Sequence, residues 1–304
     1  PSYVAQAIER FGHTDPTPSD SPHKHVPPQH GAKVQMTTLD TSPPLDAIAS
    51  TRIREIVGVF LCYARTIDNT MLVPLGTIAL QQASATEATA HACINLLNYA
   101  ATHPKGIIKY FASDMVLYNH TDASYLPEAN AAPEPLVSVG LAQPDKLNGL
   151  TAPLNGALHV LAGIMRNILS LAAKAETGSA FINAQAAVPL RQTLHEMGWP
   201  QSVTVITTDN SVTHGILNGT VKQKRSEAID MRFYWLHDRI KDGQFIIQWK
   251  PGVCNLSNYY SKHFGSPIHG GTRALCLHEP GSAEAYKDWK LLADSADALP
   301  AMPT

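Results

Sequence analysis

Hydrophobic residues recur every three or four positions in two segments near the start of the chain. Between residues 50 and 66 they fall on one face of a helix, and between 85 and 101 they form a second stripe. The stripes consist of Ile53, Ile56, Val57, Phe60 and Ala64, and of Ala90, Cys93, Ile94, Leu97 and Ala100. Because each stripe needs a partner, we predict a small helical unit whose two helices pack together across a loop around Pro74.

The pattern changes after residue 106, where short apolar runs typical of strands alternate with segments whose hydrophobic residues have helical spacing. We predict strands at 107–111, 115–119, 158–161, 203–208 and 245–249, and helices at 170–198, 227–242 and 253–264. Within the first of these helices, Pro189 predicts a break. This order begins with several strands and a helix and continues with a strand, a helix and a strand. It is typical of an α/β domain with a partly parallel sheet.

Two segments show neither the helical spacing of hydrophobic residues nor the short apolar runs typical of strands. Residues 12–45 hold seven of the 22 prolines and four of the 14 histidines, which predicts a linker or an extended surface segment. Residues 279–304 are rich in Ala, Asp and Pro, and we expect a flexible tail there.

Composition and charge narrow the class of protein. The chain has 304 residues, of which 44% are hydrophobic and 16% charged, and this balance argues against a disordered chain. A net charge of −2 excludes a global basic field, so a nucleic-acid partner needs a local patch. No apolar run approaches ~18 residues, and we therefore expect no membrane span.

The four cysteines are far apart and form no C-x-x-C pair, which argues against a disulfide framework or a zinc site. Free thiols indicate a reducing compartment, so we expect an intracellular protein, in a cytoplasmic particle or the nucleus, and not a secreted one. The chain begins at Pro1 without a signal peptide, and we expect it to be a piece of a longer polypeptide.

Acidic residues mark the ends of two predicted strands. Asp122 follows the apolar run at 115–119, and Asp209 follows the run at 203–208. In open α/β sheets ligands bind outside such strand ends, and two close carboxylates favour a divalent cation between them. Glu176, on the next helix, could supply a third oxygen ligand of the kind that suits Mg²⁺ or Mn²⁺. Each residue taken alone has a plainer interpretation, as a turn or cap for the two aspartates and as a solvated helix position for Glu176.

A series of strings resembles one family. They are TDASY, a helix with A-x-A-E, TDNS, QKRSEAIDMRFYWLHDRIKDGQFIIQWKPG and NLSNYYSKHF. In this order they resemble the ribonuclease H (RNase H) domain in the Pol polyprotein of copia-type (Pseudoviridae) LTR retrotransposons. Upstream, YVAQAIERF, IREIVGVFLCYARTIDNTML and INLLNYAATHP resemble the end of the reverse transcriptase and its connection.

The resemblance implies a fold and a division of the chain. The fold is α/β, an RNase H-like mixed five-stranded sheet flanked by helices, preceded by a small helical connection unit. The implied parts are the end of the reverse transcriptase with the Pro- and His-rich linker at 1–45, the helical connection at 46–105, the RNase H-like domain at 106–278 and the tail at 279–304.

The resemblance also implies catalytic and metal-binding roles. Asp122, Glu176 and Asp209 match three carboxylates that hold Mg²⁺ or Mn²⁺ for two-metal hydrolysis of the RNA strand in RNA–DNA hybrids. The family's fourth carboxylate falls on Asn258, whose amide lacks the charge and should bind a second ion less well. The chain contains no Y-x-D-D segment, so we expect no polymerase activity from it.

Two further regions bear on the substrate. Lys222, Lys224, Arg225 and Arg232 form a basic cluster that either binds the phosphates of a hybrid or is a solvated helix face. We predict that the aromatic residues Tyr234, Trp235 and Trp249 belong to the core. Prolines 127, 133 and 135 are poor residues for the central strand that the family places between Tyr125 and Leu158.

Three hypotheses follow. The chain is an RNase H that works beside the polymerase palm and the integrase of a Pol polyprotein, or it is a hybrid-binding module without cleavage, or it is a transposon remnant without a function. The order Asp, Glu, Asp favours RNase H over an integrase-like nuclease, whose carboxylates run Asp, Asp, Glu.

Overall fold

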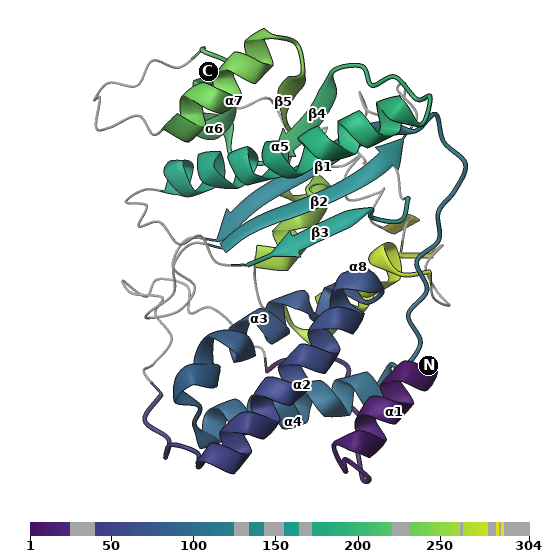
Figure 1. Ribbon diagram of the computed structural model, residues 1–304, viewed down its shortest axis with the longest axis vertical. Helices are drawn as coiled ribbons and strands as arrows, with labels where there is room; N and C mark the ends of the chain where they lie inside the picture. The colour runs from purple at the N-terminus through teal and green to yellow at the C-terminus, as the bar shows by residue number, and fades with distance from the viewer. Residues whose placement is uncertain are drawn as a thin grey trace. The chain divides into compact units, whose positions relative to one another are not determined.

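The computed structural model describes residues 1–24, 40–124, 134–142, 155–163, 172–220, 231–261, 264–278, 284–285 and 287–288. The chain divides into two compact units (Figure 1). The first unit contains the described residues that fall within 1–108 and 264–285, and the second contains those that fall within 109–261 together with 287–288.

The first unit is helical. It consists of α1 (Ser2–Arg10), α2 (Ala47–Thr66), α3 (Leu72–Gln81), α4 (Glu87–Thr102) and α8 (Ser266–Cys276), with short 3-10 turns at Asn69–Met71 and Gln82–Ser84. The two predicted helices are confirmed as α2 and α4. The loop expected around Pro74 is wrong, because this residue lies in the first turn of α3, where a helix needs no N–H from it.

Local signals and apolar burial explain α2 and α4. The Asp46 side chain accepts a hydrogen bond from the Ala49 N–H at 2.7 Å, and Thr86 forms a capping box with Thr89 at the start of α4. Most residues of the two predicted stripes are buried, namely Ile53, Ile56, Val57, Phe60, Ala64, Cys93, Leu97 and Ala100.

A buried polar network joins α8 to the rest of the first unit. The Arg273 guanidinium donates to the Asp68 carboxylate and to the Tyr99 hydroxyl, and the two charged side chains are only 2% and 0% exposed. The Tyr99 hydroxyl lies 2.7 Å from the His269 ring nitrogen, and burial lowers the pKa of His269 to about 3. This unit is therefore built from two separate stretches of sequence.

The second unit contains one mixed sheet. Its strands are β1 (Val116–Ser124), β2 (Glu134–Ala142), β3 (His159–Ala162), β4 (Thr204–Thr208) and β5 (Phe245–Trp249), in the order β3-β2-β1-β4-β5. The first three are antiparallel to one another, whereas β1, β4 and β5 are parallel. The predicted α/β fold with a mixed five-stranded sheet flanked by helices is confirmed.

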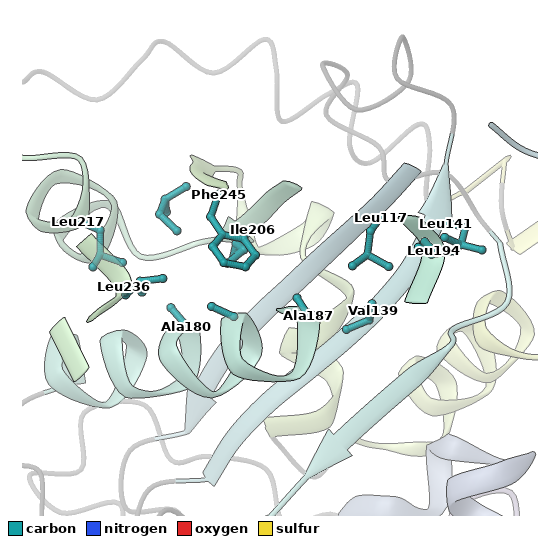
Figure 2. Close-up of a cluster of buried hydrophobic side chains, with 12 residues drawn as sticks. Leu117, Val139, Leu141, Ala180, Ala187, Leu194, Ile206, Leu217, Leu236 and Phe245 are labelled. Atoms are coloured by element: carbon teal, nitrogen blue, oxygen red, sulfur yellow. The ribbon is translucent and has the colours of Figure 1, made fainter. Parts of the chain in front are cut away.

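Helix α5 (Ala172–Glu196) lies across β1 and β2 (Figure 1). Small residues allow this close approach, because Ala180, Ala184 and Ala187 are completely buried against the sheet. These alanines belong to one core cluster with Leu117, Val139, Leu141, Ile206, Leu217, Leu236 and Phe245, and Figure 2 shows this cluster with Ala180 and Ala187 labelled. Helices α6 (Ser211–Leu217) and α7 (Met231–Lys241) complete the same core.

Several predicted elements differ from the structure. The strand at 107–111 is wrong, because this segment is irregular and the Phe111 N–H donates to the Asn155 side chain at 2.8 Å instead of to a strand. The break at Pro189 is wrong, since burial of α5 on both sides of the proline outweighs one lost N–H. The helix at 253–264 is replaced by the 3-10 turns η4 (Gly252–Cys254) and η5 (Leu256–Ser261).

Strand β2 forms despite its proline. Pro135 is the second residue of the strand and lies opposite Ala123, near the end of the ladder with β1. A strand end tolerates the missing N–H better than the middle does. Strand β1 also runs further than predicted, so Asp122 lies inside it and not beyond its end.

Candidate metal centre

Three carboxyl groups from three elements meet at one point of the second unit. Asp122 lies on β1, Glu176 near the start of α5, and Asp209 directly after β4. One oxygen of each lies within 4.8 Å of the others. The side chains of Asp122 and Glu176 are buried, and Asp209 is half-buried. The three acidic residues selected from the sequence are therefore brought together.

The path of the sheet creates this site. The parallel ladder between β1 and β4 runs from Tyr118, opposite Val205, to His120, opposite Thr207. Beyond His120, β1 continues beside β2 without β4, and β4 ends at Thr208. Asp122 and Asp209 thus stand where two parallel strands separate, the place at which α/β sheets bind ligands.

The electrostatics of the site fit a cation. Burial, together with the nearby Asp122 and Asp209 carboxylates, raises the pKa of Glu176 to about 10. Asp122 Oδ2 and Glu176 Oε2 are buried and accept no hydrogen bond. Buried oxygens of this kind need a positive partner, and three hard oxygen donors suit Mg²⁺ or Mn²⁺. The residues present therefore fit a divalent ion.

Asn258 lies at the edge of this site, on η5. A Cβ atom placed on Gly252 would stand 3.0 Å from Asp209 Oδ2 and 3.4 Å from Asn258 Nδ2, so both side chains converge on this glycine. A side chain at 252 would therefore be crowded by this close approach, whereas the backbone angle itself sets no need for glycine.

The basic residues selected from the sequence are only partly placed. Lys222, Lys224 and Arg225 lie outside the described residues, and Arg232 is half-buried on the first turn of α7. The prediction that Tyr234 and Trp249 belong to the core is wrong, since they are 49% and 43% exposed. Trp235 does pack in the core, edge-on to Phe181 with 5.2 Å between ring centroids.

Four residues near the site were given no role in it from the sequence. Ser179 and Asn183 on α5 donate to backbone carbonyls of β1, and the indole N–H of Trp249 donates to the Asp209 carbonyl at 2.9 Å. Gly252 borders Asp209, as described above. Only the pair Pro251-Gly252 carries a local signal, and that signal indicates a turn and not a metal centre.

No family model and no curated protein matches this chain. Among solved structures, it is similar to the LC11 RNase H1 isolated from compost, with 12% identity and a TM-score of 0.34 over 48% of this chain and 91% of that one. RNase H1 of Halobacterium salinarum gives 12% identity and 0.29 over 46% and 89%. A foamy viral protease-reverse transcriptase in complex with dsDNA gives 8% and 0.40 over 70% of this chain and 40% of that one. In the described part of the chain, every helix is too short or too polar to cross a membrane.

Proposed function

We propose that this chain is the RNase H region of a copia-type retrotransposon Pol polyprotein, and that it hydrolyses the RNA strand of RNA–DNA hybrids. One observation carries the proposal. Asp122, Glu176 and Asp209 place oxygens within 4.8 Å of one another, and Asp122 Oδ2 and Glu176 Oε2 are buried without a hydrogen-bond partner. The order of these residues along the chain, Asp, Glu and Asp, supports an RNase H and not an integrase-like nuclease.

The chemistry follows from the ligand set. Divalent ions in such a site stabilise negative charge on the scissile phosphate and activate a water molecule. Asp122, Glu176 and Asp209 would hold Mg²⁺ or Mn²⁺, with Asn258 at the fourth position. Its neutral amide is a weaker ligand than a carboxylate, so a second ion is bound less tightly and hydrolysis is slower than with aspartate there.

The remaining parts of the chain have proposed roles as well. Lys222, Lys224, Arg225 and Arg232 hold phosphates of the hybrid by charge. Residues 46–105 are the connection to a reverse transcriptase that ends within 1–45, and the polymerase palm and integrase are partners within the same polyprotein. The RNase H-like domain is proposed at 106–278 and the tail at 279–304.

Cleavage of an end-labelled RNA–DNA hybrid by the purified chain, in Mg²⁺ and in Mn²⁺, tests the proposal. We expect RNA-strand products that are lost in Asp122→Asn, which keeps the shape of the side chain but removes its charge. Asn258→Asp restores the fourth carboxylate, and we expect it to raise the rate and lower the metal concentration needed. Lys241→Gln, an exposed lysine on α7, is the matched control and should leave cleavage unchanged.

The outcomes separate the three hypotheses. If Asp122→Asn still cleaves the hybrid, the proposed active site is wrong. Cleavage by Asn258→Asp alone would mean an intact fold that lacks one ligand. If both folded proteins are inactive, tight and salt-dependent binding of the hybrid would favour the binding module, and its absence would favour the remnant.

A further inference from the structure

Ser179 lies on the same helix as Glu176 and contacts the backbone of Asp122, but it supplies no carboxyl group itself. It stands three positions after Glu176 on α5 and is completely buried. Its hydroxyl donates to the backbone carbonyl of Asp122 at 2.6 Å and accepts a hydrogen bond from the Thr121 hydroxyl at 2.8 Å. Ser179 thus ties the helix that carries Glu176 to the strand residue that carries Asp122.

The position of this contact along β1 is informative. The ladder with β4 ends at His120, and from that residue on, side-chain donors contact the strand's carbonyls. Asn183 Nδ2 donates to the His120 carbonyl at 2.8 Å, and Asn255 Nδ2 donates to the Thr121 carbonyl at 2.8 Å. Ser179 continues the series at Asp122. Side chains therefore hold the backbone of β1 at the end of its ladder with β4 and just beyond it.

Helix geometry carries this restraint to Glu176. Residues three apart on an α-helix lie on the same face, so Glu176 and Ser179 both face β1. A bond from Ser179 to the Asp122 backbone consequently restrains the separation of the backbone positions from which the two carboxyl groups project. Residues that hold metal ligands in place by hydrogen bonds, without binding the metal themselves, usually change metal affinity by ~10- to 100-fold when they are removed.

We propose that Ser179 is a positioning residue that sets the separation of Asp122 and Glu176 for the bound ion. The inference rests on the proposed function, because it assumes that these carboxyl groups hold a metal. It does not depend on turnover, since the restraint acts on metal affinity whether or not the hybrid is cut.

Mn²⁺ binding to the full chain, measured by calorimetry without nucleic acid, tests this inference. We expect Ser179→Ala to weaken Mn²⁺ binding by ~10-fold or more, while the KM for the hybrid at saturating metal stays unchanged. Thr193→Ala is the matched control, because Thr193 also donates from α5 to a backbone carbonyl, that of Pro189 at 3.0 Å, far from the site. It should bind Mn²⁺ like the wild type.

A double variant separates positioning from plain stability. Ser179→Ala leaves the buried Thr121 hydroxyl without its acceptor, and Thr121→Val with Ser179→Ala removes that unpaired group. We expect the double variant to regain stability in urea unfolding but to keep the weakened Mn²⁺ binding. Recovery of Mn²⁺ affinity together with stability would mean a purely structural role and overturn the inference.

The proposed function and this inference fail in different ways. If the wild-type chain binds no Mn²⁺, the proposed metal centre is wrong and the role of Ser179 falls with it. If the wild type binds Mn²⁺ and folded Ser179→Ala binds it equally well, the metal centre stands and only the positioning role is refuted.

Discussion

Replacing Gly252 with alanine would add one methyl group at the edge of the candidate metal centre. The new Cβ would stand 3.0 Å from Asp209 Oδ2, whereas ordinary contacts begin at 3.4 Å. The Asp209 carboxylate must therefore move by about 0.4 Å, or the η4 turn must move away from it. The backbone itself accepts alanine, because Gly252 does not have a left-handed φ.

The size of the effect follows from that displacement. A misplacement of about 1 Å at an active site costs ~100-fold in rate, so a shift of about 0.4 Å corresponds to roughly sixfold. Stability should change little, since the reduced freedom of the unfolded chain contributes up to ~1 kcal/mol and offsets part of the strain. We expect Gly252→Ala to melt near the wild-type temperature but to need more Mg²⁺ for half-maximal hybrid cleavage.

The assay is the initial rate of cleavage over an Mg²⁺ titration, combined with thermal melting. Gly163→Ala is the matched control, because no atom lies within 4 Å of the position of its Cβ. Wild-type rate and Mg²⁺ dependence in a folded Gly252→Ala protein would refute the reasoning, since the methyl group would then fit without moving Asp209.

Three further predictions concern stability and are read by urea unfolding. Arg273→Met leaves the buried Asp68 carboxylate without its cation and should destabilise the first unit by ~3–5 kcal/mol. A change below ~1 kcal/mol is what a solvent-exposed ion pair would give, and it would contradict the burial of this pair. With a metal chelator present, the free energy of unfolding should fall by up to ~1.4 kcal/mol per pH unit above pH 4.5. The reason is that folded Glu176, with its pKa raised to about 10, keeps a proton that the unfolded chain releases. Glu176→Gln should remove this slope. Ala184→Leu overpacks the contact of α5 with the sheet and should cost ~1–3 kcal/mol, with a smaller loss pointing to free space there.

Burial explains which parts of the fold could be predicted from the sequence. The run at 203–208 predicted β4 because every residue of that strand is buried in the middle of the sheet. The run at 107–111 has the same apolar character, but Ile107, Tyr110 and Phe111 are each at least half exposed. An apolar run forms a strand only when a neighbouring strand is available, and the neighbour is set by tertiary structure.

The candidate metal centre was only partly predictable for a related reason. Asp122 and Asp209 stood out because each follows or ends an apolar run, and Glu176 because small residues surround it. Ser179 contacts Asp122 across 57 positions of sequence, and Gly252 matters only through the side chain of Asp209. No local pattern encodes such contacts, so the supporting residues appear only when the chain is folded.

The split sequence of the first unit has a consequence for synthesis on the ribosome. Asp68 and Arg273 are separated by 205 positions, and the five strands of the second unit are made between them. At ~5–20 residues per second, the ribosome needs roughly 10–40 s to reach the arginine. During that time the helices made first carry a carboxylate that cannot yet be buried with its cation. The first unit therefore cannot complete its buried ion pair until the sheet of the second unit has been made.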